Sequence, residues 1–415
     1  MKKIERKLFE EIKKHLSSKE ISLIIGPRQT GKTTLMTWLK EYLETQDQKT
    51  AFFSLDFEPD KQFFVSQSAL IAKLELEFGK NKGYVFIDEI QRKENAGIFL
   101  KGIYDLNLPY KFIVSGSGSL ELKEKIHESL TGRKRIFELN TVTFEEFVNF
   151  KTDYRYKDKL VEFFDLDKDQ TANFLREYLN FGGYPKVILE DRLSEKIKII
   201  DEIYHSYLEK DISYLLNVAK INEFSSLIKI LASQIGNLVN YSELSSTVGI
   251  SSQTIKNYLW YAEKTFIIRR INPYFRNIRK EITKSPMIYF YDLGLRNYTL
   301  GIFGNLYQPH ELGFLFENLI LNLLREKLRY TGSSIYFWRT KDGAEIDFVI
   351  DSKKEILPIE VKYKKLDKKV LIERSMTNFI KEYSPKEAWI VNIGVEKEFF
   401  INKTKVKIIP FFKLL

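Results

Sequence analysis

The segment Gly26–Thr33 constrains the fold of this chain more than any other, because it fits the pattern G-x-x-x-x-G-K-[ST] at every fixed position. A β-branched run, Ile21–Ile25, precedes it, and apolar residues at helical spacing follow from Thr34 onward. The pattern predicts a buried parallel strand, a tight glycine loop and a helix, in that order. We therefore expect an α/β fold built on a parallel sheet.

The residue types in this segment suit the binding of a nucleoside triphosphate. Gly26 and Gly31 let the backbone curl so that successive N–H groups point at phosphate oxygens, at the positive end of a helix. Lys32 is expected to reach the β- and γ-phosphates, and Thr33 to place its hydroxyl on Mg²⁺. We expect ATP and Mg²⁺ as cofactors, and the candidate binding residues are Gly26, Pro27, Arg28, Gln29, Thr30, Gly31, Lys32, Thr33 and Thr34.

Two adjacent acids follow the next strongly apolar run. Tyr84–Ile87 reads as a strand that leads into Asp88 and Glu89, which resembles a Walker B motif. A strand that ends at Asp88 would set this carboxylate beside Mg²⁺. Glu89 could orient and polarise the attacking water, so we expect it to be catalytic together with Lys32.

Serines and arginines further along are candidates for sensing and completing the site. Ser115 and Ser117 follow a third apolar strand. Polar residues at this end of a nucleotide-binding sheet lie where a γ-phosphate or the attacking water would be sensed. An ordinary Gly/Ser loop is the alternative. Arg133 and, second to it, Arg135 lie between a glycine turn and another expected strand. An arginine of this kind supplies charge to the transition state, often in the site of a neighbouring subunit. Surface arginines without such a role are the alternative.

The order of these motifs carries a family resemblance. Together with Asn180-Phe181-Gly182-Gly183-Tyr184-Pro185, it resembles the AAA-superfamily ATPases of archaea and bacteria that have an uncharacterised C-terminal domain, and the resemblance covers nearly the whole chain. It implies ATP hydrolysis and a helical lid after the sheet, here from Phe144 to about Ile212. Since AAA-type sites commonly lie between subunits, it also implies a homo-oligomer, such as a ring, with Arg133 acting on a neighbour.

From Phe224 onward the pattern changes to short helices followed by strands. One helix carries an apolar face from Phe224 to Ala232, a second starts at Tyr241, and Ser251 can cap a third. The third helix would bury Ile255, Leu259 and Ala262 and expose Gln253, Thr254, Lys256 and Asn257. This is the layout of a helix-turn-helix, whose second helix usually enters the major groove of DNA.

Two expected strands would complete a winged helix. Ile267–Ile271 and Met287–Phe290 are separated by the basic residues Arg276, Arg279 and Lys280, which suit contacts to phosphates. We expect DNA binding, and a module used for packing or protein contact is the alternative.

The C-terminal third places acids on expected strands. Asp347 lies in one strand, and Glu360 and Lys362 lie in the next, on one face by the two-residue period. Glu317, on a very apolar helix, is an acid that needs a partner. Two carboxylates and a lysine can hold Mg²⁺ or Mn²⁺ and assist a water that attacks a phosphodiester.

This set resembles the restriction-endonuclease-like, PD-(D/E)xK fold, with Glu317 as an additional acid and Lys362 as the catalytic lysine. Ile346 stands where the named motif has proline, and Tyr363 and Lys364 follow the lysine in place of the usual polar residues. An inactive or DNA-binding fold, or an unrelated sheet, are the alternatives. The basic run Lys362–Lys369 would favour DNA or form a solvated loop.

Composition sets the outer limits. The chain has 415 residues, which is more than a single hydrophobic core usually organises. It has no cysteine, and this excludes disulfides and thiolate chemistry. No signal core and no bilayer-length apolar run is evident, so we expect a cytoplasmic location and no membrane partner. The net charge of +10 suggests a polyanionic partner, either nucleic acid or an anionic membrane face. A solvated lysine-rich surface is the alternative.

These observations predict four parts: an ATPase core at 1–150, a helical lid at 151–215, a winged helix at 216–295 and a nuclease-like domain at 296–415. The predicted function is ATP hydrolysis that acts on DNA. A nucleotide-dependent switch or scaffold for a protein partner, with an inactive nuclease-like domain, is the alternative. A nucleotide-gated toxin or defence component is a third reading.

Overall fold

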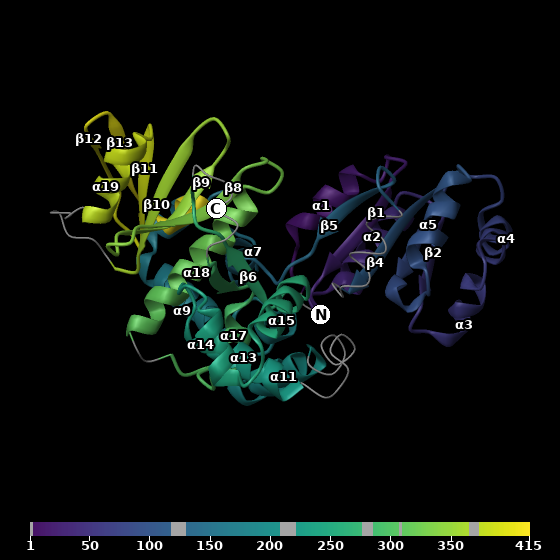
Figure 1. The fold of residues 1–415 in the computed structure, drawn as a ribbon. Coiled ribbons are helices and arrows are strands. Elements are labelled where there is room, and N and C mark those ends of the chain that lie inside the picture. Colours follow the sequence, from purple (N-terminus) through teal and green to yellow (C-terminus); the bar gives the residue numbers. More distant parts are fainter. Residues whose placement is uncertain (1–2, 118–129, 208–220, 276–284, 307–308, 365–372) are drawn as a thin grey trace.

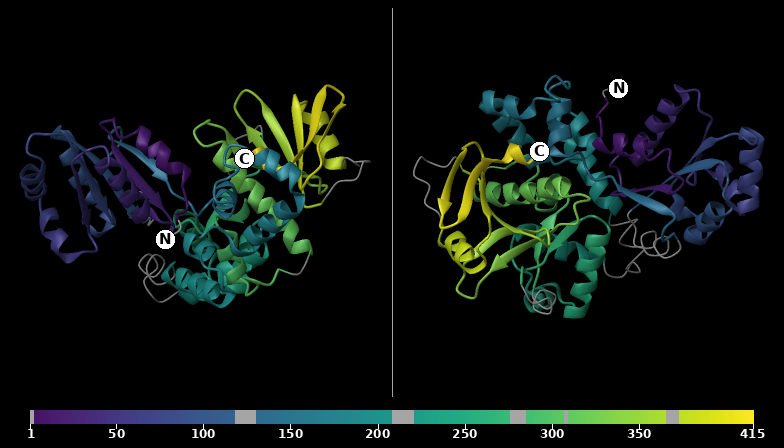
Figure 2. Two further views of the ribbon diagram at one scale, coloured as in Figure 1. Left: turned by 180° about the vertical axis from the view of Figure 1, so that it is seen from behind. Right: turned by 90° about the horizontal axis from the view of Figure 1, so that it is seen from above.

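The computed structural model describes residues 3–117, 130–207, 221–275, 285–306, 309–364 and 373–415. In Figure 1 the chain forms an N-terminal lobe around one sheet and a larger body of helices that carries a second sheet. Figure 2 shows the same separation of the two lobes from behind and from above. The phosphate-binding loop segment lies in the N-terminal lobe.

The N-terminal lobe has a five-stranded sheet whose strands are all parallel, in the order β2-β3-β4-β1-β5. The strands are β1 (Ile21–Gly26), β2 (Thr50–Ser54), β3 (Gly83–Asp88), β4 (Tyr110–Ser117) and β5 (Lys134–Glu138). Its helices and short 3-10 turns are α1 (Lys7–Lys14), α2 (Lys32–Glu44), α3 (Glu58–Lys61), η1 (Gln62–Phe64), α4 (Gln67–Phe78), η2 (Ile90–Arg92) and α5 (Ala96–Asp105).

Helices cover both faces of this sheet because both faces are apolar. On β1, Leu23 and Ile25 join the cluster that includes α4 and α5, whereas Ile24 joins the cluster formed with α1 and α2. Alternate side chains of a strand point to opposite faces, so a fully apolar strand needs a cover on each side. The result is a three-layer α/β/α lobe, which confirms the predicted α/β class with a parallel sheet.

A run of helices follows the first sheet. It comprises α7 (Phe144–Lys151), α8 (Leu160–Leu166), α9 (Lys168–Phe181), α10 (Pro185–Leu189), α11 (Leu193–Ser206), α13 (Ile221–Ser233), α14 (Tyr241–Val248), α15 (Ser252–Lys264) and α17 (Leu293–Thr299). Between α15 and α17, β6 (Ile268–Ile271) and β7 (Met287–Phe290) form an antiparallel pair.

The C-terminal part begins with the long helix α18 (Pro309–Lys327) and contains a six-stranded mixed sheet in the order β12-β13-β11-β10-β9-β8. The strands are β8 (Ser334–Arg339), β9 (Glu345–Asp351), β10 (Ile356–Lys362), β11 (Glu387–Asn392), β12 (Lys397–Ile401) and β13 (Thr404–Pro410). Helix α19 (Arg374–Tyr383) and the turn η4 (Phe411–Leu414) complete it. Helix α18 packs on the sheet at β10.

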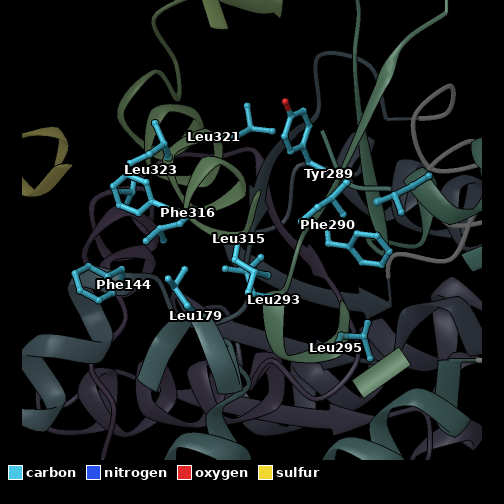
Figure 3. Packing of buried hydrophobic residues seen from close by; sticks show 14 of the residues in the cluster. Phe144, Leu179, Tyr289, Phe290, Leu293, Leu295, Leu315, Phe316, Leu321 and Leu323 are labelled. Carbon is cyan, nitrogen blue, oxygen red and sulfur yellow. The ribbon is translucent and has the colours of Figure 1, made fainter. Parts of the chain in front are cut away.

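One hydrophobic cluster runs through most of the body, and a separate cluster lies between α19 and the C-terminal sheet. The first extends from α7 and α9 through α17 to α18 and the C-terminal sheet, and Figure 3 shows its centre, with Phe144, Leu179, Phe290, Leu293 and Leu315 converging. Complete burial of one such side chain stabilises the fold by about 1.5 to 3 kcal/mol. The helical, strand-paired and C-terminal regions therefore share a core, and the predicted four-part division of the chain stays a prediction.

The two lobes touch along α1, β5 and the end of α18. The Arg329 guanidinium donates to the Glu138 carbonyl at 2.9 Å, and the Tyr330 hydroxyl donates to the Glu11 carboxylate at 3.0 Å. A cavity of about 800 Å³ lies beside these contacts, with Asn140 and Arg325 among the residues that line it.

Most predicted elements are present, and one is shorter than expected. The apolar residues Ile4, Leu8, Ile12 and Leu16 fall on one face at helical spacing, which predicts a first helix over residues 4–16. In the structure α1 covers Lys7–Lys14, because Arg6 is extended, with φ −112° and ψ 128°. Ile4 and Leu16 are nevertheless buried, so the apolar stripe continues beyond the helix at both ends. No helix among the described residues is long and apolar enough to cross a membrane.

The helices and strands expected for a winged helix are also present. Ser251 caps α15 by accepting from the Thr254 amide at 3.1 Å, and α15 buries Ile255 and Leu259. It leaves Gln253, Lys256 and Asn257 exposed and Thr254 partly so. The basic residues predicted between the wing strands, Arg276, Arg279 and Lys280, lie outside the described residues, as does most of the Lys362–Lys369 run. The winged-helix assignment and its DNA binding stay predictions.

Candidate functional site

The phosphate-binding loop joins the carboxyl end of β1 to the start of α2. Gly31 precedes α2 with φ +91°, a left-handed conformation that favours glycine. Gly26 faces a different constraint, because a Cβ there would lie 2.1 Å from the Leu139 carbonyl oxygen. The glycine pattern therefore reflects one conformational and one steric requirement of this loop.

Inside the loop, hydrogen bonds to carbonyl oxygens hold the chain in place. The Lys32 ammonium donates to the Gly26 carbonyl at 3.0 Å and to the Pro27 carbonyl at 2.7 Å, and Lys32 is buried. The Thr30 hydroxyl donates to the same Pro27 oxygen at 2.9 Å. The remaining predicted loop residues, Arg28, Gln29, Thr33 and Thr34, lie in the same turn or the first turn of α2.

Three residues from separate elements meet at the carboxyl end of the sheet. The Thr33 hydroxyl donates to Asp88 Oδ2 at 2.6 Å, and the Ser115 hydroxyl donates to Asp88 Oδ1. Strands β3 and β4 are parallel neighbours, which brings the end of β3 next to Ser115. Ser117 lies opposite Gly26 in the β1–β4 register. A hydroxyl and a carboxylate in contact at the phosphate loop are suitable oxygen ligands for Mg²⁺.

Glu89 follows Asp88 in a left-handed turn, with φ +56°. Burial raises the pKa of its carboxyl, and the nearby Asp88 raises it further, whereas the Lys32 ammonium acts in the opposite direction. The Gln91 side-chain amide donates to this carboxylate. A carboxylate with a raised pKa beside the loop has the properties of a general base.

Arg133 lies away from this cluster. Its carbonyl accepts from the amide of Ile21, the first residue of β1, so it sits at the amino end of the sheet, and the loop sits at the carboxyl end. Its guanidinium is ion-paired with Asp105 at 2.7 Å. Arg133 therefore does not reach the phosphate loop of its own chain, and a role in a neighbour's site stays a prediction. Arg135, in β5, lies over the Phe137 ring at 5.4 Å.

The C-terminal acids come from two strands and one helix. In the antiparallel β9–β10 ladder, Ile359 pairs with Phe348, which brings Glu360 to the level of Asp347. Asp347 Oδ2 accepts from the Val361 amide at 2.6 Å. Lys362 Nζ lies 2.8 Å from Glu360 Oε1 and 2.6 Å from Glu373 Oε1.

Glu317, on α18, accepts from the Tyr289 hydroxyl at 2.5 Å, and burial raises the pKa of this carboxyl to about 7. Burial also raises the pKa of Glu360 to about 7 and that of Asp347 well above its ordinary range, and in Asp347 the charge of Glu317 adds to the effect. The pKa of Lys362 is raised because the neighbouring carboxylates, Glu360 first, outweigh its burial.

Within the described ranges, no three His, Cys, Asp or Glu side chains are arranged to hold a metal ion. Glu317, Asp347, Glu360 and Lys362 lie in one region. The carboxylates there contact the Val361 amide, the Lys362 ammonium and the Tyr289 hydroxyl. The Mg²⁺ or Mn²⁺ predicted for this region stays a prediction.

Several residues at these sites were not predicted from the sequence. Glu345 lies two residues before Asp347 and has a raised pKa because of burial, and the Glu-x-Asp spacing could have indicated it. Tyr289 and Glu373 gave no local signal. Arg6, which donates to the carbonyl of Thr30, belongs to no recognisable motif in the sequence. Its ion-pair partner Glu146 does, because Thr143-x-x-Glu146 is a helix-capping signature.

Comparisons with known proteins agree with the N-terminal site. Residues 18–148 match a family described as AAA domain, and the phosphate loop and the parallel sheet of this region agree with that match. Residues 172–306 and 312–414 match two families described as domains of unknown function, DUF8612 and DUF4143. An AAA domain binds nucleotide, so ATP is the cofactor to be expected, typically with Mg²⁺.

Similar proteins include the uncharacterized protein MJ1544 of Methanocaldococcus jannaschii, 24% identical over 84% of this chain and 76% of its own length. An uncharacterized protein of Haemophilus influenzae is 26% identical over 83% of this chain and 82% of its own length. Among solved structures, the replication initiator DnaA bound to AMPPCP and single-stranded DNA covers 62% of this chain and 86% of its own, at 15% identity and a TM-score of 0.28. That score is too low to indicate a shared overall arrangement.

Proposed function

We propose that this chain hydrolyses ATP at the loop Gly26–Thr33. The observation that carries the proposal is the 2.6 Å hydrogen bond between the Thr33 hydroxyl and Asp88, which are 55 residues apart in the sequence. The same carboxylate accepts from Ser115 on the neighbouring strand. Three oxygen groups thus converge at the start of α2, where the helix dipole favours phosphate.

The roles of the individual residues follow from this arrangement. The loop amides and Lys32 would bind the phosphates, and Thr33 and Asp88 would hold Mg²⁺, which supplies charge neutralisation between the β- and γ-phosphates when it is bound. Glu89 would accept the proton of the attacking water, and the raised pKa of its carboxyl makes it a stronger base than an exposed glutamate. Ser115 would hold Asp88 in position and sense the γ-phosphate.

The test separates binding from hydrolysis. Glu89→Gln should bind a fluorescent ATP analogue as the wild type does but release phosphate about 100-fold more slowly, because the base is lost and the loop is intact. Glu94→Gln, an exposed acid five residues further on, is the matched control and should hydrolyse ATP normally. Weak analogue binding by Glu89→Gln would show that Glu89 is structural, and the absence of hydrolysis by the wild type would overturn the proposal.

We further propose that the C-terminal region acts on DNA. Asp347, Glu360 and Lys362 lie together on adjacent strands, and Glu360 Oε2 is buried without a hydrogen-bond partner among the described residues. A buried carboxylate oxygen of this kind is costly unless a ligand satisfies it. Helix α15 exposes Lys256 and Asn257, and the net charge of +10 adds attraction for phosphates.

Two measurements test this second proposal. Gel shifts with duplex, forked and single-stranded DNA at several salt concentrations should show affinity that falls as salt rises. Asp347→Ala should abolish cleavage in Mn²⁺ and leave the ATPase rate unchanged. Asp351→Ala, on the same strand but beyond the cluster, should leave both the cleavage and the ATPase rate unchanged. Affinity that is absent or insensitive to salt would favour the alternative, a nucleotide-dependent switch or scaffold that binds a protein partner.

A further inference from the structure

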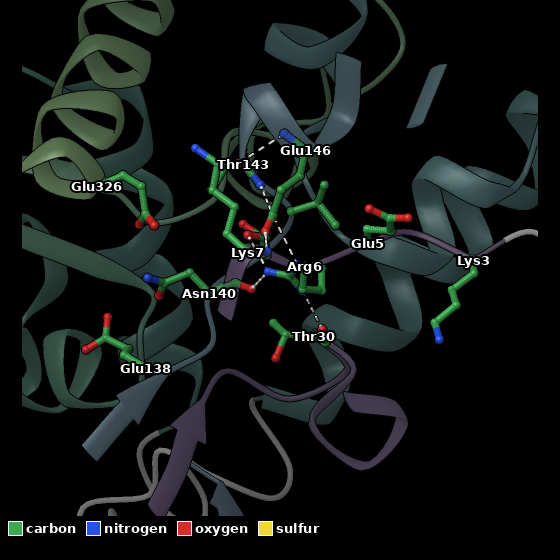
Figure 4. Close-up of polar contacts among 12 residues, drawn as sticks. Lys3, Glu5, Arg6, Lys7, Thr30, Glu138, Asn140, Thr143, Glu146 and Glu326 are labelled. Atoms are coloured by element: carbon green, nitrogen blue, oxygen red, sulfur yellow. Dashed lines mark hydrogen bonds and ion pairs between the residues drawn. The ribbon is translucent and has the colours of Figure 1, made fainter. Parts of the chain in front are cut away.

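Arg6 occupies a buried position between the phosphate loop and the helical body, just before α1. Its side chain is only 8% exposed and is ion-paired with Glu146, which is 6% exposed, at 3.0 Å. Figure 4 shows Arg6 at the centre of contacts with Thr30, Asn140 and Glu146. These partners belong to three different parts of the chain: the loop, the segment after β5 and the first turn of α7.

On the loop side, Arg6 fixes the orientation of one peptide group. Arg6 Nη1 donates to the Thr30 carbonyl oxygen at 3.0 Å. The Thr30–Gly31 peptide is trans, so its N–H points opposite to its C=O. Because Arg6 holds the carbonyl oxygen of this peptide, the Gly31 amide is fixed on the side opposite to Arg6, and loop amides of this kind bind phosphate.

On the side of the helical body, Arg6 contacts the segment before α7 and the first turn of that helix. Arg6 Nη2 donates to the carbonyl oxygens of Asn140 and Thr141 at 2.6 Å and 3.2 Å. Glu146, the partner of Arg6 Nε, also accepts from the Thr143 amide at 3.0 Å and completes the capping box of α7. The first residue of that helix, Phe144, packs in the core of the body against Tyr178 and Phe411.

We propose that Arg6 is a positioning residue that couples the phosphate loop to helix α7, so that nucleotide binding and the position of α7 depend on each other. The proposal rests on nucleotide binding at the loop, the function proposed above. One rigid planar guanidinium holds the loop carbonyl, the exit from the sheet and the helix cap at fixed mutual distances. A shift of the loop on phosphate binding therefore moves the cap of α7, and coupling of this kind is reciprocal.

Two substitutions separate this coupling from simple support of the fold. Arg6→Lys keeps the charge beside Glu146, but a single ammonium cannot reach all three groups of partners. Glu146→Gln retains an oxygen acceptor for the cap and touches no atom of the loop. Lys157→Ala is the control, because it removes another ion pair of the N-terminal segment, the exposed 2.7 Å pair with Glu5.

The experiment measures the affinity for a non-hydrolysable ATP analogue and the deuterium uptake of α7, with and without the analogue, in the full chain. In the wild type and Lys157→Ala, the analogue should slow exchange in the first turn of α7. Arg6→Lys and Glu146→Gln should each bind it about tenfold more weakly and lose that change, within the range of typical coupling energies. Thermal unfolding verifies that each variant is folded. If Arg6→Lys does not fold, Glu146→Gln alone tests the proposal.

The outcomes distinguish the two proposals. If the wild type fails to bind the analogue, the proposed function is overturned and the coupling with it. If the wild type binds and a folded Arg6→Lys or Glu146→Gln keeps both the affinity and the response of α7, only the coupling is overturned. Weaker binding by Glu146→Gln, which lies outside the loop, supports it.

Discussion

At the scale of single residues, Lys32 shows how the loop holds a buried cation in place. The ammonium is buried and donates to two carbonyl oxygens of its own loop, Gly26 and Pro27. Burial of an unpaired ammonium would be costly, and these two bonds offset that cost. The cation is thereby held at the start of α2, beside Thr33.

We expect Lys32→Ala to abolish ATP hydrolysis, with a fall in kcat of about 100-fold or more, because the charge that would contact the β- and γ-phosphates is lost. Steady-state phosphate release measures this change. Lys40→Ala is the matched control, since Lys40 lies on the same helix and forms an i,i+4 pair with Glu44 at 2.7 Å. Normal turnover by Lys32→Ala would remove this loop from the mechanism.

At the scale of elements, α18, β9 and β10 bring carboxyl groups together in an apolar setting. The pKa of Glu317 and that of Glu360 are each raised to about 7 by burial, and burial also raises the pKa of Asp347 well above its ordinary range. The folded chain therefore holds protons that the unfolded chain releases at a lower pH. As the pH rises, ionisation lowers the free energy of the unfolded state first, so the stability of the fold falls.

For Glu317 this loss is expected between its ordinary pKa of 4.5 and about 7. Glu317→Gln removes the titration and keeps an acceptor for the Tyr289 hydroxyl, so we expect it to be more stable than the wild type at pH 8, by about 1 to 3 kcal/mol. The difference should be much smaller at pH 5. Urea unfolding at both pH values measures it.

Glu355→Gln provides the control for this titration, because Glu355 is exposed and its pairing with Lys386 is at the surface. Its stability should follow the wild type at both pH values within the small range typical of surface pairs. If Glu317→Gln shows the same pH dependence as the wild type, Glu317 does not carry the raised pKa.

At the scale of the whole molecule, the two lobes leave Arg133 at a surface of the N-terminal lobe. It lies at the amino end of β5, paired with Asp105, and both side chains are partly exposed to solvent. A residue in this place cannot act at the loop of its own chain, but it is accessible to a second copy. A homo-oligomer with sites completed between subunits is therefore the arrangement in which Arg133 would have a catalytic role.

A mixing experiment tests this arrangement. Chains with Lys32→Ala and chains with Arg133→Ala should each be nearly inactive, and a mixture should recover part of the ATPase activity, because some sites would combine an intact loop with an intact arginine. Sedimentation at the assay concentration reports whether the chains assemble. Full activity of Arg133→Ala alone would exclude the arginine from catalysis, and an assembled but inactive mixture would exclude a shared site.

Local patterns predicted much of the fold. The strand, loop and helix around Gly26–Thr33, the strand that leads into Asp88 and the cap of α15 by Ser251 all lie where the sequence indicated. Each depends on interactions between residues close in sequence, namely hydrophobic periodicity, glycine conformations and side-chain caps. The start of α1 was less well predicted, because Ile4 is buried by tertiary packing without being helical.

The sequence by itself determined the phosphate loop, the acids at the end of β3 and the acids within β9 and β10, because fixed spacing within one segment specifies them. Only the tertiary structure decided how they combine: the contact of Thr33 with Asp88, the approach of Glu317 to Tyr289, the distance of Arg133 from the loop and the links from Arg6 to the loop and to α7. Those pairs are separated by tens of residues or more. Their meeting depends on the order of strands in the sheet and on burial in a shared core, which no local pattern encodes.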